Sequence, residues 1–389
     1  MNGHIYKRGS TYTYVIDLGR DPITNKRNQK SKGGFKTKKE ANAALSHILA
    51  SYNEGTYINE TDMTLAEFSD KWIKLYSKTG NVKISTVRVR QHEINNVKAY
   101  FKEAKMKDIT SLMYQDFLLY LLSNFAHNTL TGIHRTAKMI FKKAIEMRLI
   151  LNDPTQYAKV PKKVKTVEEL EHETEIPKYF EKEELNEFLE LSKQDISPQT
   201  YVIFLTLAYT GIRIGELCAL KWKDIDFTSK EISIYKTYYN PVNNTINYTL
   251  LPPKTKTSKR KIQVDDIVIE ALRKHKLRQN ELRLRITSWH KENFVFTKFI
   301  NYPGYPETPK QIEIVMDRII KKNGLKKLTP HGLRHTHVSL LAEAGVGLKE
   351  IMERLGHKDD ETTTSIYMHV TKAMKTEAST KFSKLMNSV

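Results

Sequence analysis

The sequence has little cysteine and no long apolar run. Cys218 is its single cysteine in 389 residues, which excludes an internal disulfide framework and a zinc site built from cysteine ligands. No apolar run reaches the length of a transmembrane helix, and no secretion signal opens the chain. We therefore expect a cytoplasmic protein that has no membrane partner.

Acidic residues are too few to balance the basic ones. Lysine and arginine number 64 against 44 aspartates and glutamates, which gives a formal net charge of +20 at pH 7. The excess charge indicates a polyanionic partner such as nucleic acid, although ribosome-associated and membrane-surface proteins share it. The chain is also long enough for two or three domains.

Residues 1–55 have the pattern of a small β-domain. Aromatic and β-branched residues fall in short runs separated by turn signals, which predicts a three-stranded sheet. Thr37 and Glu40 then form a capping box at the start of a helix with an apolar face. A sheet with basic strands can lie in a DNA groove, so Lys30 and Lys32 are expected DNA contacts. A solvated β-domain is the alternative.

Residues 61–161 contain four stretches with apolar residues at helical spacing, the first of which begins at Thr64. They predict an all-α bundle of four helices. Arg88 and Arg90 are assigned to the polar side of the second stretch and are expected DNA contacts, while a helical scaffold without a DNA role is the alternative. Residues 162–177 turn from basic to acidic without an apolar period, which predicts an exposed linker.

Residues 178–389 predict a mainly helical domain with a small antiparallel sheet. Three short strands are expected within residues 232–264. The basic segment 252–260 lies between the last two, and we predict that it forms a β-hairpin able to reach into a DNA groove. The expected DNA contacts in this segment are Lys256, Lys259 and Arg260.

One stretch near the C-terminus places reactive side chains at the ends of predicted helices. Thr329 and the following proline begin a helix, so His331 and Arg334 lie one turn apart on one face. His357 follows a second short helix, and Tyr367 lies beyond it. Arginine matches phosphate oxygens, histidine can transfer a proton and tyrosine can be a nucleophile, so the set favours chemistry on a phosphodiester. Each residue taken alone is better explained as an ordinary surface side chain.

A second candidate pair lies in the motif TGIRIGELCALKWKDID. Arg213 follows Gly211, and Glu216 lies three residues later, one helical turn away on the same face. A carboxylate at this spacing can orient an arginine beside a phosphate. A surface ion pair is the alternative.

These motifs resemble those of the tyrosine recombinases, the phage integrase family. HGLRHT, LGH and IY at these separations are similar to the family's C-terminal box, and TGIRIGELCALKWKDID is similar to its first-arginine box. The two N-terminal modules resemble the arm-type and core-binding domains of integrases from phages and integrative conjugative elements. The resemblance implies a multi-domain α+β fold with an arm-type DNA-binding domain at 1–55, a helical core-binding domain at 61–161, a linker at 162–177 and a catalytic domain at 178–389.

The resemblance also implies a function. Members of the family cleave and rejoin DNA through a 3′-phosphotyrosyl intermediate, so we expect a site-specific recombinase that integrates and excises a mobile element. Its partners would be double-stranded DNA at attachment sites, other protomers in a homotetramer on that DNA, and a directionality factor or host DNA-bending factor. A chromosome-dimer resolvase of the same chemistry and a non-cutting DNA-binding regulator are the alternatives.

The family's catalytic positions can be assigned residue by residue. Glu216 would support the first arginine, and Lys256 is the fallback for the general acid at Lys254 because the length of this segment varies in the family. We expect no metal or cofactor, since His335 and His337 do not share one helical face with His331. The implied catalytic residues are Arg213, Lys254, His331, Arg334, His357 and Tyr367.

Overall fold

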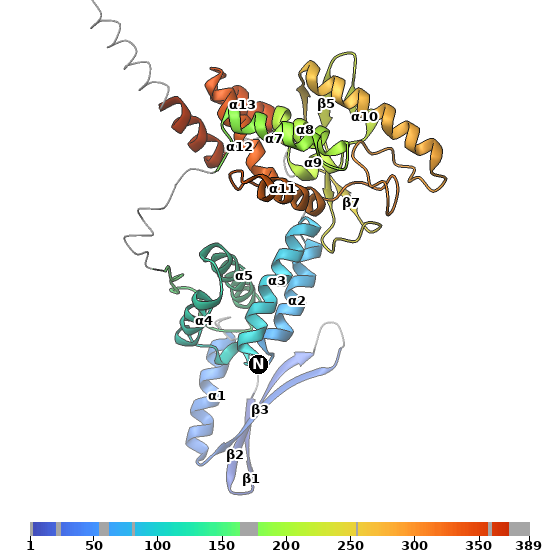
Figure 1. Cartoon of the computed structure of the whole chain (residues 1–389). Helices are drawn as coiled ribbons and strands as arrows, with labels where there is room; N and C mark the ends of the chain where they lie inside the picture. The colour runs from blue at the N-terminus through green and yellow to red at the C-terminus, as the bar shows by residue number, and fades with distance from the viewer. Residues whose placement is uncertain are drawn as a thin grey trace, which may run out of the picture. The chain divides into compact units, whose positions relative to one another are not determined.

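The computed structural model describes residues 3–20, 25–53, 62–79, 82–163, 178–253, 256–356 and 360–372. The chain divides into two compact units, Met1–Lys165 and Thr166–Val389 (Figure 1). Both contain helices, and the strands form small antiparallel sheets, so the multi-domain α+β fold is confirmed. Among the described residues no helix is long and apolar enough to cross a membrane.

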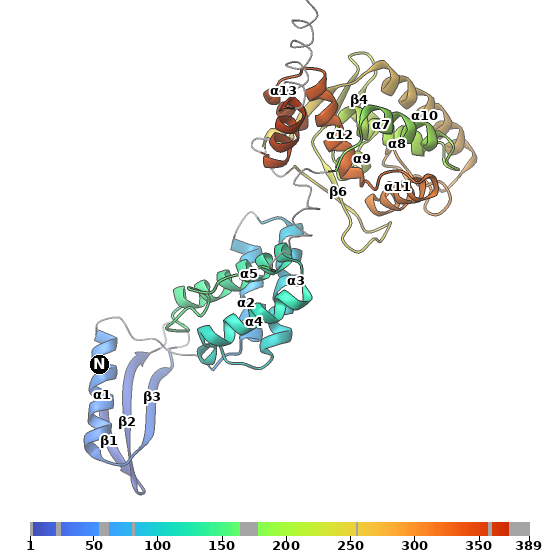
Figure 2. The same cartoon turned by 60° about the vertical axis from the view of Figure 1, so that its left-hand side comes forward.

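The N-terminal strands form the predicted three-stranded antiparallel sheet, in the order β1-β2-β3. Tyr14 and Ile16 of the central strand are buried with Leu45 of the helix that follows the sheet. Figure 2 shows this helix lying along the strands. The bounds are β1 (Gly3–Arg8), β2 (Thr11–Arg20), β3 (Arg27–Phe35) and α1 (Lys38–Asn53).

The next four α-helices pack into a bundle with a core of their own. At its start, the hydroxyl of Thr64 accepts a hydrogen bond from the Glu67 backbone amide at 3.2 Å, and the Glu67 carboxylate accepts one from the Thr64 amide at 2.9 Å. This capping box begins the first helix as the sequence predicts. The elements are α2 (Leu65–Thr79), α3 (Ile84–Phe101), η1 (Met106–Asp108), α4 (Ser111–Asn124) and α5 (His127–Glu146).

The second unit is built around α8, nearly all of whose residues are buried. This helix packs against α7, α10 and α12, which are labelled around it in Figure 1. A further helix covers 361–372. The elements are α7 (Lys182–Lys193), α8 (Gln199–Thr210), α9 (Ile214–Cys218), η2 (Trp222–Asp224), β4 (Ile225–Asp226), β5 (Glu231–Ile234), β6 (Thr237–Tyr239), β7 (Thr249–Leu251), η3 (Lys256–Ser258), β8 (Arg260–Gln263), α10 (Asp266–Arg285), α11 (Pro309–Asn323), α12 (Pro330–Glu343) and α13 (Leu348–Leu355).

The basic segment before β8 is not the predicted β-hairpin. Strand β7 pairs with β6, whereas β8 pairs with β5, so the segment connects two different sheets. Pro252 and Pro253 follow β7 directly, and a proline has no amide hydrogen to donate to a strand ladder. We therefore call residues 252–259 the basic segment from here on.

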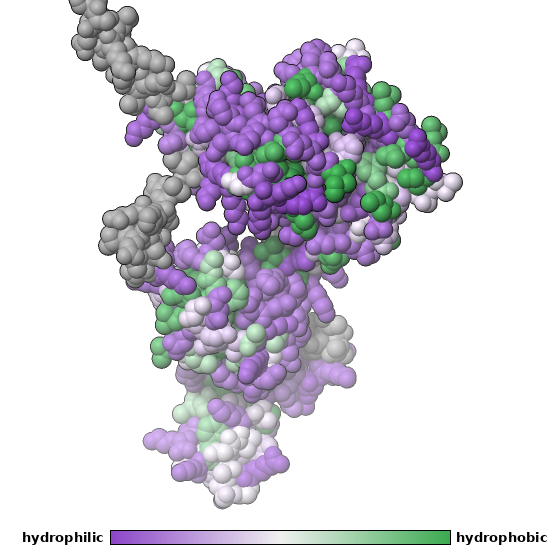
Figure 3. Space-filling view, in the orientation of Figure 1, coloured by the Kyte–Doolittle hydropathy of each residue, from purple (hydrophilic) through white to green (hydrophobic). Residues whose placement is uncertain are grey.

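The surface of both units is rich in polar side chains. Figure 3 shows a face on which hydrophilic residues predominate and hydrophobic ones fall in separate patches. The most exposed of the large hydrophobic residues in the described chain include Ile196 and Ile300. Exposed apolar residues are normal on a protein surface.

Candidate functional site

A tight turn at the end of α8 positions Arg213. The helix ends at Gly211, whose backbone is left-handed with φ 62°. A Cβ atom there would lie 2.6 Å from Cδ2 of His337 and 2.7 Å from a methyl of Leu355, so both the conformation and the space require glycine. Arg213 then caps α9, with its side chain 37% exposed.

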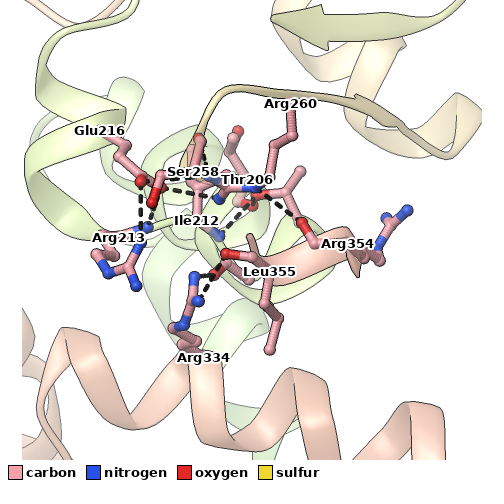
Figure 4. A network of polar contacts seen from close by, with 11 residues as sticks. Thr206, Ile212, Arg213, Glu216, Ser258, Arg260, Arg334, Arg354 and Leu355 are labelled. Carbon is pink, nitrogen blue, oxygen red and sulfur yellow. Dashed lines mark hydrogen bonds and ion pairs between the residues drawn. The ribbon is translucent and has the colours of Figure 1, made fainter. Parts of the chain in front are cut away.

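Glu216 is a buried carboxylate that holds Arg213 in place. It accepts hydrogen bonds from the Arg213 amide at 3.0 Å and from Arg213 Nη1 at 3.1 Å. Burial alone would raise the pKa of this carboxyl, but the hydrogen bonds and charge of Arg260, together with Arg213, bring the pKa below its usual value. Glu216 is therefore ionised at neutral pH and lies between the two arginines (Figure 4).

Arg260 is the second cation on this carboxylate. Its Nη2 donates to Glu216 Oε2 at 2.9 Å, and its Nη1 lies 3.3 Å from Oε1. Its Nε donates to the backbone carbonyl of Arg354 at 2.8 Å, and Nη1 also donates to the carbonyl of Ser258 at 3.1 Å. The side chain is only 6% exposed, so the residue expected to contact DNA lies inside the protein.

Arg334 reaches the same turn from α12. The helix begins at Thr329, whose hydroxyl caps it, and Pro330 occupies its first position as predicted. Arg334 Nη1 donates to the carbonyl of Gly211 at 2.6 Å, and Nη2 donates to that of Leu355 at 2.8 Å. Only 2% of Arg334 is exposed. Burial, followed by the charge of Arg213, lowers its pKa to about 9, so it stays protonated at neutral pH.

His331 lies one turn before Arg334 on the same helix. Its ring packs edge-on against that of His335, with the ring centres 4.8 Å apart. Partial burial and the charges of Arg334 and Arg213 lower the pKa of His331, while the nearby Asp360 opposes the shift. The imidazole is therefore mainly neutral at pH 7 and can accept a proton.

His337 has a structural role in the same helix. Its Nδ1 donates to the carbonyl of Ala208 at 2.8 Å, and Arg354 Nε donates to its Nε2 at 3.0 Å. Burial, followed by the charge of Arg354, lowers its pKa to about 3. Both nitrogens of the neutral ring are thus engaged.

Within the described ranges, no group of three or more histidine, cysteine or acidic residues could hold a metal ion.

Tyr367 lies on the helix over 361–372. Asp360 begins this helix, because its carboxylate accepts hydrogen bonds from the amide of Thr363 at 3.3 Å and from its hydroxyl at 2.6 Å. Tyr367 is half-buried against a cluster that includes Ile351 and Leu355 of α13. Its ring therefore packs on α13, the helix whose last residue, Leu355, also accepts a hydrogen bond from Arg334.

Two residues of the implied catalytic set cannot be placed. Lys254 and His357 lie outside the described residues, as does the side chain of Lys256. His357 directly follows Gly356, the left-handed residue that ends α13. Lys259 is described and exposed beside the buried Arg260.

The expected DNA contacts of the first unit have unlike surroundings. Lys30 and Lys32 on β3 pair with Ile16 and Tyr14, so they lie on the side of the sheet that α1 covers, where Lys32 remains exposed.

The two arginines of α3 also differ. Arg88 is exposed, whereas Arg90 donates to Glu93 at 2.8 Å and to the hydroxyl of Thr136 in α5 at 2.7 Å. Its side chain is 15% exposed. Gly132 leaves space for Glu93, because a Cβ atom there would lie 2.5 Å from the Glu93 carboxylate. Arg90 therefore ties α3 to α5 within the bundle.

Three family descriptions match successive parts of the chain. The phage integrase family matches residues 178–374, an arm DNA-binding domain matches 4–52, and the N-terminal SAM-like domain of phage integrases matches 64–122. The first match contains all the residues labelled in Figure 4.

Individual proteins resemble the chain over most of its length. The integrase of Staphylococcus phage L54a is 31% identical over 338 residues, which cover 83% of this chain and 94% of that protein. The Tn1549 transposon integrase in complex with transposon right-end DNA has a TM-score of 0.64 at 24% identity, covering 81% of this chain and 99% of that one. A lambda integrase tetramer bound to a Holliday junction has a TM-score of 0.56 at 18% identity, covering 93% and 94%. These two likenesses show a shared fold.

Proposed function

The chain belongs to the phage integrase family of tyrosine recombinases, and we propose that it cleaves and rejoins DNA at attachment sites through a 3′-phosphotyrosyl intermediate. Integration and excision of a mobile element would be the outcome. The observation that carries the proposal is the convergence of Arg213 and Arg334 around Gly211, since each comes from a different part of the sequence.

The two arginines are suited to bind the phosphate in the transition state of cleavage. As Tyr367 attacks, negative charge builds up on the non-bridging oxygens of the phosphodiester, and two guanidinium groups can donate to both. Glu216 fixes Arg213, and two backbone carbonyls fix Arg334. Groups held in this way need little reorganisation during the reaction. His357 is proposed as a third donor.

The proton transfers complete the cleavage step. His331, whose lowered pKa keeps its imidazole neutral, accepts the phenolic proton of Tyr367 or donates a hydrogen bond to the phosphate. The Tyr367 oxygen bonds to phosphorus while the bond from phosphorus to the 5′ oxygen breaks. Lys254, or Lys256 in its place, gives that oxygen a proton. A 5′-hydroxyl of a second strand can reverse the step, so neither ATP nor water is consumed.

The remaining parts of the chain are proposed to hold the DNA. Residues 1–55 would bind arm sites and 61–161 the core site, joined by the linker 162–177 to the catalytic domain at 178–389. We propose a homotetramer on two duplexes, because lambda integrase of the same fold forms a tetramer on a Holliday junction. A directionality factor or host DNA-bending factor would act with it. Such a protein would work in the cytoplasm.

An integrase is favoured over a chromosome-dimer resolvase because residues 4–52 match an arm DNA-binding domain. Arg334 and Arg260 both keep their buried hydrogen bonds, to the Gly211 carbonyl and to Glu216. An intact arginine cluster of this kind argues against a regulator that binds DNA without cutting it.

The proposal is tested with a nicked duplex that carries the crossover site, selected beforehand from random duplexes by binding. Cleavage beside the nick frees a short strand and traps the protein on DNA, so we expect a covalent complex that survives denaturation. Tyr367→Phe removes only the attacking oxygen and should bind the duplex normally while forming no complex. A complex at the wild-type level in this variant would assign the nucleophile to another residue, and none with the wild type would refute the cutting function.

A further inference from the structure

The guanidinium of Arg260 contacts three segments at once. It bonds Glu216 in α9, the carbonyl of Ser258 in the basic segment, and the carbonyl of Arg354 in the last turn of α13. In Figure 4 the side chain of Arg260, the first residue of β8, extends between Glu216 and the end of α13. No other labelled side chain in this view is hydrogen-bonded to all three segments.

Two of these segments, the end of α13 and the basic segment, also meet by close packing. A Cβ atom on Gly356 would lie 3.1 Å from Arg260 Cδ, Ser258 Cα and the carbonyl oxygen of Thr257. Gly356 has a left-handed backbone with φ 69°, which disfavours other residues independently. The end of α13 therefore lies directly on the base of the basic segment. Any shift of one would move the other.

The contacts of Arg260 require an arginine. Its five donors point in fixed directions, and four hydrogen bonds use three of its nitrogens. A lysine could neutralise Glu216 but could not also reach both carbonyls. A buried cation that satisfies one carboxylate and two carbonyls is also costly to misplace, so it locks one arrangement of the three segments.

We propose that Arg260 is a positioning residue of the recombinase, which aligns the groups that flank the phosphate without touching DNA. The inference rests on the proposed function. Through Glu216 it sets Arg213, through Ser258 the basic segment with its general-acid lysine, and through Arg354 the turn that carries His357. Arg260 thereby changes from an expected DNA contact to a link between catalytic groups.

The test compares three variants with the full-length protein. Arg260→Met removes the guanidinium group and its charge. Arg260→Lys removes the guanidinium group but keeps the charge, and it serves as the test if Arg260→Met fails to fold. Arg273→Met is the matched control, because Arg273 on α10 also donates to a backbone carbonyl, that of Phe227 at 3.1 Å, and packs on an aromatic ring. Duplex affinity, melting temperature and the single-turnover rate of covalent-complex formation are measured for each.

A second substrate separates positioning from general loss of structure. It carries sulfur in place of the bridging 5′ oxygen at the cleavage site, and a thiolate leaves without receiving a proton. For Arg260→Lys and Arg260→Met we expect the rate on the oxygen substrate to fall about 100-fold, with affinity within about threefold of the wild type. On the sulfur substrate the fall should be about tenfold smaller, because misplacement of the lysine no longer matters.

Three results would overturn the inference. They are a wild-type rate for Arg260→Lys, an equal loss on the two substrates, or a loss of affinity as large as the loss of rate. The Arg273→Met control should match the wild type on both substrates. If the wild type itself forms no covalent complex, the proposed function fails. If the wild type forms the complex and the Arg260 variants form it at the same rate, the proposed function stands and the positioning role fails.

Discussion

The N-terminal sheet and the proposed catalytic centre hold their positive charges in opposite ways. On the sheet, Lys32 is exposed to solvent, and so is Lys36 directly after β3. At the centre, Arg334 is 2% exposed and Arg260 has a side chain that is 6% exposed, and each donates to fixed oxygens of the protein. The two regions therefore differ in how firmly each cation is held.

The difference teaches what each region can do. An exposed lysine releases counterions when it meets a phosphate, which supplies affinity that depends on salt and tolerates many positions. A buried arginine has already lost its water, and its position is set to within the tolerance of its hydrogen bonds. We infer that the sheet contributes binding and that the centre contributes rate.

The largest effect is expected when the charge at the centre is kept but the planar guanidinium group is replaced by an ammonium group. Arg213→Lys and Arg334→Lys should each lower the rate of covalent-complex formation by about 100-fold or more, while duplex affinity changes less than about threefold. Single-turnover rates and binding curves on the same nicked duplex measure both. Equal losses of rate and affinity would make these arginines ordinary backbone contacts.

The burial of Arg260 could have been predicted from the sequence. It has the same parity as Ile262 and Val264, which are both buried, so alternation along β8 places it on the inner face. Arg90 likewise falls at helical spacing with the buried Ile94 and Val97. Charge suggested two DNA contacts, whereas periodicity placed both side chains toward the interior.

The starts of helices were predictable because they depend on near neighbours. The helices begin at Thr64 and Thr329 as the sequence predicts, and both threonines cap them. The pairing of β7 with β6 was not predictable, since it depends on the conformation of residues 240–248, which connect the two strands. One partner of Arg334, Gly211, lies 123 residues away in sequence, so the spacing of the motif could identify Arg334 but could not give this contact.

On the sheet, removing charge should have a moderate effect on affinity alone. The double variant Lys30→Gln with Lys32→Gln should bind full-length attachment DNA about tenfold more weakly at low salt, with a salt slope smaller by about two. Its rate on a short core-site duplex should not change. Binding titrations over a range of salt concentrations measure the first effect.

A matched charge loss shows whether the strand position matters. Lys38→Gln with Lys39→Gln removes two charges from the first turn of α1 in the same small domain. We expect a smaller loss of affinity than for the β3 pair. Equal losses would mean that net charge alone matters, and unchanged affinity in both variants would remove the arm-binding role from this sheet.

The smallest expected effect concerns the stability of the centre in acid. The pKa of His337 is about 3 in the folded protein, against an ordinary histidine pKa of 6.5. At a pH below 6.5 the unfolded chain therefore binds a proton at His337 that the folded protein does not bind. Its contribution to stability is therefore complete above pH 6.5 and is lost as the pH falls toward 3. At pH 5 the loss is about 2 kcal/mol of unfolding free energy relative to pH 7.

Thermal melting at pH 7 and pH 5 measures this loss. His337→Gln can still donate and accept but does not titrate, so its melting temperature should fall less between the two pH values, by roughly 4 to 8 °C. Glu216 does not contribute in this window, because its lowered pKa makes its effect appear only in stronger acid. The same fall for the variant and the wild type would show that His337 is not held neutral.

The most direct test of the account is to identify the residue that carries the DNA. The covalent complex is formed on the nicked duplex in the presence of EDTA, digested with nuclease and protease, and analysed by mass spectrometry. The account predicts that the peptide containing Tyr367 carries a nucleotide joined through its 3′ phosphate. A nucleotide on any other residue, or a complex that forms only when a divalent metal is added, would contradict it.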